Sequence, residues 1–122
     1  MHRSTPVALW QQVFEQLEHH ARVKRDRTPL DALNRILRKH YAASRVAPET
    51  WSIEARRLDP SEVAKLSRVP VSAPPHDSTA PIVVVCVGER WCVVDGNKRV
   101  NAWLKQPTES LDAIVIAPRV TR

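Results

Sequence analysis

Apolar residues in the first third of the chain recur at the spacing of a helix face. Ser4 or Thr5 precedes Pro6, and a hydroxyl cap before a proline is typical of a helix start. Thr28 and Pro29 repeat this signal. Two apolar stripes follow, Trp10, Val13, Phe14, Leu17 and Ala21 after the first start, and Leu30, Leu33, Leu37 and Tyr41 after the second. The pattern predicts an N-terminal helical hairpin whose stripes form core or interface.

Beyond the hairpin, the apolar spacing changes from helical to alternating. Trp51, Ile53 and Ala55 alternate with polar residues, which predicts a half-buried strand. The sequence Asp59-Pro60-Ser61-Glu62 then carries the pattern of a capping box. We therefore expect a short helix after this strand, ending near Ser67.

Two further apolar runs, Ile82–Val87 and Trp91–Val94, predict a β-hairpin. The first run is almost continuously apolar, which favours a central strand covered on both faces. A three-residue loop over residues 88–90 would place Cys86 opposite Cys92. A disulfide is then conceivable, but burial in the sheet and a cytoplasmic location favour two reduced, inert thiols.

A closing strand is expected at Leu111–Ala117, and a proline-rich surface loop at Val69–Pro81. These elements predict an α+β fold. Residues 49–122 would form a small mixed β-sheet, and the hairpin of residues 1–48 would pack against it in one compact unit.

Composition limits the classes of protein that this chain can represent. The length of 122 residues suits one domain, and 43% hydrophobic with 26% charged residues is typical of a folded globular protein. No apolar run approaches the roughly 20 residues that span a bilayer. The sequence Met1-His2-Arg3-Ser4-Thr5-Pro6 lacks the apolar core of a signal peptide, so we expect a cytoplasmic protein without membrane partners.

The formal net charge of +6 indicates an acidic partner such as a nucleotide or a nucleic acid. Basic residues gather in two clusters, Arg22, Lys24, Arg25 and Arg27 between the helices, and Arg35, Arg38, Lys39 and His40 on the second helix. A solvated surface is the common interpretation of any one such cluster. Two neighbouring clusters favour contact with DNA or RNA phosphates, for which Arg35, Arg38 and Lys39 are the candidates.

The most informative segment runs from Trp91 to Leu104 and reads as strand, glycine turn and helix start. Gly96 allows a backbone conformation that other residues avoid. Lys98 and Arg99 then fall in the first helical turn, where cations oppose the helix dipole. This placement is favourable when an anion binds there, because cations and unpaired N–H groups converge on it. The alternative is an ordinary Asp95-Gly96 turn followed by a solvated charge pair.

The sequence Asp95-Gly96-Asn97-Lys98-Arg99, which we call the box, resembles the phosphate-binding box of the ParB/sulfiredoxin superfamily. The order of the predicted elements over the last two-thirds of the chain is similar to that family as well. The closest form is the Asp-Gly-x-His-Arg box of ParB-like ATPases and nucleases, here with Lys98 in place of the histidine. Asn97 occupies the position of the catalytic cysteine of sulfiredoxins, which argues against sulfiredoxin chemistry.

The resemblance implies that Gly96, Asn97, Lys98 and Arg99 bind the phosphates of ATP or another nucleotide. Lys98 and Arg99 would neutralise developing charge, and Asp95 would hold Mg²⁺ or orient the turn. Two carboxylates are candidates for a general base, Glu54 and Glu62, although a polar strand position and a capping box explain them equally well.

Two classes of function follow. The first is an enzyme that hydrolyses ATP, with metal-assisted nuclease activity as an extension. The second is a non-catalytic module that binds a nucleotide or nucleic acid, while the helical hairpin binds a protein partner or forms a homodimer. An interference factor carried on a plasmid or another mobile element is a biological role compatible with either class.

Overall fold

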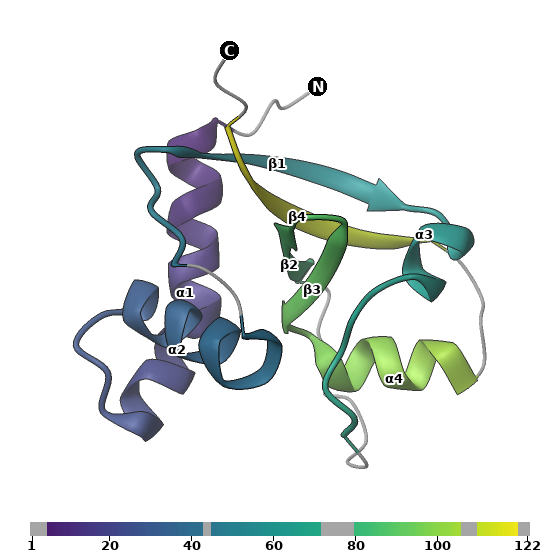
Figure 1. Cartoon of the computed structure of the whole chain (residues 1–122), viewed down its shortest axis with the longest axis horizontal. Helices are drawn as coiled ribbons and strands as arrows, with labels where there is room; N and C mark the ends of the chain where they lie inside the picture. The colour runs from purple at the N-terminus through teal and green to yellow at the C-terminus, as the bar shows by residue number, and fades with distance from the viewer. Residues whose placement is uncertain (1–4, 43–44, 72–79, 106–109, 120–122) are drawn as a thin grey trace.

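The computed structural model describes residues 5–42, 45–71, 80–105 and 110–119 and has a mixed α+β fold. Its elements are α1 (Pro6–Lys24), α2 (Pro29–Tyr41), β1 (Trp51–Leu58), α3 (Pro60–Ala64), β2 (Ile82–Val87), β3 (Arg90–Asp95), α4 (Asn97–Lys105) and β4 (Leu111–Pro118). The four strands form one sheet in the order β1-β4-β2-β3 (Figure 1). The β2–β4 pair is parallel and the other two pairs are antiparallel, which confirms a small mixed sheet.

The helical hairpin forms as its caps predict. The Thr5 hydroxyl accepts from the Ala8 N–H, and the Thr28 hydroxyl accepts from the Asp31 N–H, both at 3.1 Å. The buried stripe of α1 is Leu9, Val13, Leu17 and Ala21. Trp10 and Phe14, expected in that stripe, are only partly buried and stack on each other at its margin.

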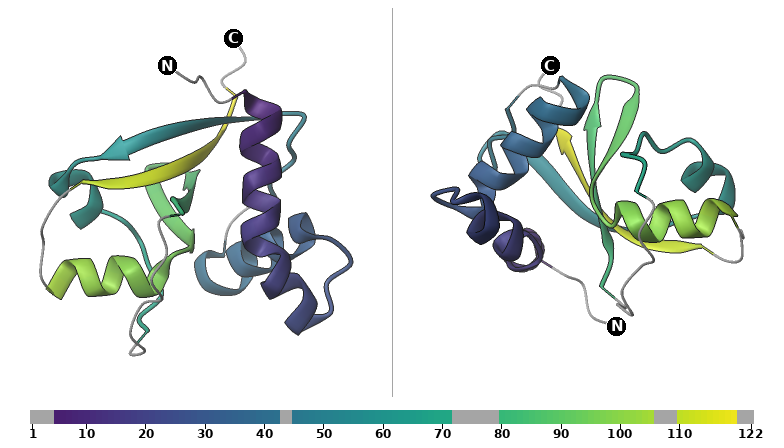
Figure 2. Two further views of the ribbon diagram at one scale, coloured as in Figure 1. Left: turned by 180° about the vertical axis from the view of Figure 1, so that it is seen from behind. Right: turned by 90° about the horizontal axis from the view of Figure 1, so that it is seen from below.

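The helices lie on both faces of the sheet, α1 and α2 on one and α3 and α4 on the other (Figure 2). Residues from α1, α2 and all four strands share one hydrophobic cluster, so the hairpin has no core separate from that of the sheet. A second cluster joins α3 and α4 to the opposite face. Residues 82–85 of β2 are fully buried between these layers, which confirms a central strand covered on both faces.

The cysteines do not face each other, contrary to the expected hairpin register. Arg90 belongs to β3, so the turn contains two residues instead of three, and Cys86 pairs with Trp91 while Val85 pairs with Cys92. A shift of one residue moves a side chain to the other face of a sheet. The two thiols therefore lie on opposite faces, and burial raises the pKa of Cys86 to about 11 and that of Cys92 in the same direction.

The expected helix after β1 is shorter than predicted. Asp59 and Glu62 form the capping box, but α3 ends at Ala64. Ser67 instead forms a parallel bridge with Cys92 at the outer edge of β3. Within the part of the chain that the structure describes, no helix has both the length and the apolar character needed to cross a bilayer.

Candidate anion-binding site

The box forms the strand–turn–helix junction that its sequence predicts. β3 ends at Asp95, α4 begins at Asn97, and Gly96 between them has a φ of 101°. A Cβ at Gly96 would lie 2.5 Å from Cγ2 of Ile82, which is fully buried. Both the backbone angle and the close approach to β2 therefore require glycine here.

The first turn of α4 offers unpaired donors. The Val100 N–H donates to the Gly96 carbonyl at 3.0 Å and so begins the helical hydrogen bonds. The backbone N–H groups of Asn97, Lys98 and Arg99 have no hydrogen-bond partner among the described residues. The same holds, within those residues, for the half-buried Lys98 ammonium group. The start of α4 thus combines free backbone N–H groups with one uncommitted cation, and this combination favours the binding of an anion.

The side chain of Asn97 has a structural role. Its Oδ1 accepts from the Val69 N–H at 2.8 Å, and its Nδ2 donates to the Val93 carbonyl at 3.2 Å. These two bonds join the chain after α3 to the end of β3. In the box, Asn97 can therefore offer a ligand its backbone N–H but not its amide side chain.

Arg99 is also engaged with the protein. Its Nη1 donates to the carbonyl of Ala80, just before β2. A guanidinium group has five N–H donors, so this contact orients Arg99 and leaves other donors for a ligand. Arg99 thus differs from Lys98, whose side chain has no partner among the described residues.

Asp95 is held by two residues of α1. Gln16 Nε2 donates to Asp95 Oδ2 at 3.0 Å and to the Pro81 carbonyl at 2.8 Å. His20 Nε2 lies 3.5 Å from Asp95 Oδ1. Burial acts to raise the pKa of Asp95, but the hydrogen bonds from His20 and Gln16 and the charges of His20 and Arg99 outweigh it, so the pKa is lowered.

The sequence pattern did not identify Gln16 and His20 as neighbours of Asp95. Gln16 and His20 are four residues apart and share one face of α1, beside the buried positions Leu17 and Ala21. The spacing of four residues was the feature of the sequence that could have indicated two polar side chains acting together. Only the packing of α1 against the end of β3 shows that this polar face meets Asp95.

The donors around Asp95 also bear on the Mg²⁺ site expected there. Gln16 and His20 each engage one carboxylate oxygen, and no group of three potential metal ligands occurs among the described residues. A metal at Asp95 would have to displace one of these contacts. The role of Asp95 as a Mg²⁺ ligand therefore stays a prediction.

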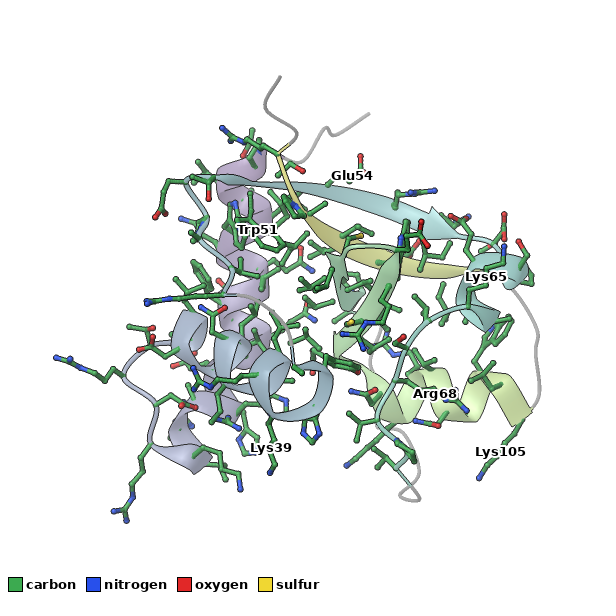
Figure 3. All side chains as sticks on the ribbon, in the orientation of Figure 1. Lys39, Trp51, Glu54, Lys65, Arg68 and Lys105 are labelled. Carbon is green, nitrogen blue, oxygen red and sulfur yellow. The ribbon has the colours of Figure 1, made fainter. Side chains whose placement is uncertain are left out.

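The two candidate bases lie elsewhere. Glu54 is exposed on β1, the edge strand farthest from β3 in the strand order (Figure 3). Glu62 accepts from Arg56 at 2.7 Å and closes the capping box of α3. Among the described residues, no hydrogen bond or ion pair joins Glu54 of β1 or Glu62 of α3 to the box.

The basic candidates on α2 divide into two kinds. Arg35 forms an ion pair with Asp26, with Nη2 at 3.0 Å from Oδ2 and Nε bonded to both carboxylate oxygens. Arg38 and Lys39 are exposed and have no partner within the described ranges (Figure 3 labels Lys39). Arg35 therefore holds the inter-helix loop, whereas Arg38 and Lys39 are available to a ligand.

A comparison of the chain with protein-family models, curated proteins and solved structures finds no match.

Proposed function

We propose that the start of α4 binds the phosphate groups of a nucleotide, with ATP as the first candidate. The observation that carries this proposal is the coincidence of unpaired N–H groups at Asn97, Lys98 and Arg99 with the uncommitted Lys98 ammonium group. The N–H groups and the positive end of the helix dipole favour an anion. The resemblance of the box to the ParB/sulfiredoxin type supports the same ligand.

In this proposal each box residue has a separate role. Gly96 lets the backbone turn so that the amides face outward, and Lys98 contributes charge directly to the phosphates. Arg99 adds N–H donors while its contact with Ala80 holds its orientation. Mg²⁺ carried by the nucleotide would supply further neutralisation of phosphate charge, and no step of the proposal uses Asp95 as its ligand.

Hydrolysis of the bound nucleotide is a second candidate, which the His20–Asp95 contact favours. His20 Nε2 faces Asp95, so Nδ1 can accept the proton of an attacking water while Asp95 stabilises the charged imidazole. The water oxygen would bond to the terminal phosphorus as the bond to the leaving phosphate oxygen breaks. The same chemistry on a phosphodiester would be nuclease activity. In this candidate His20, which contacts Asp95 of the box, takes the role of base instead of Glu54 or Glu62.

Calorimetric titration with ATP, CTP and inorganic phosphate tests the binding proposal. We expect Lys98→Ala to weaken ATP binding about tenfold or more, since one charge-assisted contact is lost. Lys105→Ala, a change of the same charge at the exposed end of the same helix, is the matched control (Figure 3). Equal affinity of Lys98→Ala and the wild type would reject the site.

Turnover in the same samples separates an enzyme from a binding module. For an enzyme, we expect His20→Gln to retain ATP binding and lose phosphate release. If the wild type with Mg²⁺ releases no phosphate from ATP and cuts no DNA, the function is binding alone.

Contact with nucleic acid through α2 is a third candidate, supported by the exposure of Arg38 and Lys39. Neutralising both should lower the slope of log affinity against log salt by about two units, one for each phosphate contact. Arg35→Ala should leave that slope almost unchanged because Arg35 already pairs with Asp26. An unchanged slope in the double variant would identify a solvated surface.

We also propose that the protein is located in the cytoplasm, because nucleotides and nucleic acids are both present there.

A further inference from the structure

The outer edge of β1 carries backbone groups without partners. The Arg119 N–H donates to the Thr50 carbonyl at 3.2 Å, and this bond sets the alternation of the antiparallel β1–β4 pair. Residues 52, 54, 56 and 58 therefore bond to β4, and the N–H and C=O groups of Ile53, Ala55 and Arg57 point away from it. No described strand or loop pairs with these groups.

Side chains along this edge have a symmetric charge pattern. Ala55 is small, exposed and central in the strand, with Glu54 before it and Arg56 after it. Glu54 forms no hydrogen bond or ion pair in the described part of the chain. Arg56 uses Nη2 for Glu62 and lies 5.1 Å from the centre of the Trp91 ring, which leaves its other N–H donors available.

We propose that β1 pairs in antiparallel fashion with β1 of a second copy of this chain, about a two-fold axis at Ala55. The N–H of Ala55 would donate to the carbonyl of Ala55 of the partner subunit, and Ile53 and Arg57 would exchange bonds with the partner's Arg57 and the partner's Ile53. The two four-stranded sheets would become one continuous sheet.

Charge selects this register. With the axis at Ala55, Glu54 lies opposite Arg56 of the partner subunit, and the symmetry repeats this favourable pair. An axis one residue earlier places Glu54 opposite Glu54 of the partner subunit. An axis one residue later places Arg56 opposite the partner's Arg56. Of these three registers, only the one centred on Ala55 joins unlike charges.

Sedimentation velocity over a range of protein concentrations tests the proposal, with Ala55→Pro as the first variant. Proline removes the central outward N–H but no bond to β4, so we expect a folded monomer where the wild type is a dimer. Ala55→Val keeps the N–H and is the matched control, expected to remain dimeric. Circular dichroism confirms that each variant is folded.

A charge exchange tests the register itself. Glu54→Arg and Arg56→Glu should each be monomeric, because each places like charges opposite each other. Mixing the two variants should restore a dimer, since every cross-strand pair in the mixed species then joins an arginine and a glutamate. Glu15→Arg changes the same charge on an exposed face of α1 and should leave the wild-type dimer intact.

Hydrogen exchange provides an independent readout. The amides of Ile53, Ala55 and Arg57 should become protected as concentration rises, whereas those of Glu54 and Arg56 should be protected at all concentrations. A wild type that stays monomeric throughout would overturn the proposal. So would a dimer that survives Ala55→Pro and dissociates on Val23→Lys, which would place the interface on α1, where Val23 is 60% exposed.

Discussion

The two edges of the sheet differ in how their polar groups are used. At the β3 edge, the Ser67 N–H donates to the Trp91 carbonyl and the Val93 N–H donates to the Ser67 carbonyl, both at 2.8 Å. The Val93 carbonyl also accepts from the Tyr41 hydroxyl at 2.6 Å and from Asn97. At the β1 edge, the outward groups of Ile53, Ala55 and Arg57 have no partner among the residues described.

The β3 edge is thus closed by other segments of the chain, whereas the β1 edge has backbone groups without described partners. At the β3 edge, Tyr41 and Ser67 join α2 and the chain after α3 to the strand that leads into the box. Such a closed edge provides a rigid support for the start of α4, and a binding site needs rigid support. The β1 edge has no covering segment among the described residues, and it carries the unlike charges of Glu54 and Arg56.

Of the substitutions considered, a proline in each edge strand should give the largest difference in the free energy of unfolding between the two edges. Val93→Pro removes the N–H that donates to Ser67 and the buried valine side chain, so we expect a loss of about 3 kcal/mol or more in the free energy of unfolding. Ala55→Pro should change it by about 1 kcal/mol or less in the monomer. Urea denaturation at low protein concentration measures both. Similar losses would mean that the β1 edge is also paired.

The next largest effect is expected at the turn into α4. Gly96→Ala forces an alanine to a φ of 101° with its Cβ 2.5 Å from Ile82, which should destabilise the fold by about 3 kcal/mol. Gly88→Ala, at a φ of 61° with no atom within 4 Å of its Cβ, should cost only about 1 kcal/mol. The difference between the two denaturation midpoints measures the combined effect of the larger φ and the contact with β2, and equal midpoints would exclude both.

Asn97 should matter more to stability than its neighbour in the same turn. Asn97→Ala leaves the Val69 N–H without its acceptor, and we expect a loss of about 2 kcal/mol. Lys98→Ala should stay within about 0.5 kcal/mol because its side chain has no partner among the described residues. Thermal denaturation of the pair distinguishes the structural role of Asn97 from the ligand role proposed for Lys98. A reversed order would contradict both assignments.

The smallest expected effect is a pH dependence at the contact between α2 and β3. Burial raises the pKa of Tyr41 to about 12 from 10.0, so the folded state favours the protonated hydroxyl. Its contribution to stability is complete below about pH 10 and is lost as the pH rises towards 12. Tyr41→Phe should flatten this decline relative to the wild type. Parallel declines in the two proteins would assign the effect to other groups, such as the Cys86 thiol, whose pKa is raised in the same direction.

The amino-acid sequence of the box does not predict which of its side chains are hydrogen-bonded within the protein. Asn97 and Lys98 are adjacent polar residues in one helical turn, yet the side chain of the first is bonded to two segments and that of the second is uncommitted. Glu54 looked like a candidate base because its residue type suits that role. The residue type gives no information about position: Glu54 lies on β1, at the opposite edge of the strand order from β3, and forms no hydrogen bond or ion pair with the box.

The sequence by itself determined the local features of this protein. Hydroxyl caps before prolines, the capping box at Asp59 and the glycine after β3 act over a few residues, so their patterns specify the helix starts and the turn. Tertiary structure decided what depends on distant segments: the α1 residues that hold Asp95, and the edge of the sheet that is left open. These outcomes arise from packing between segments far apart in the chain. The hydrophobic and polar pattern of a segment predicts its secondary structure but does not specify which other elements pack against it.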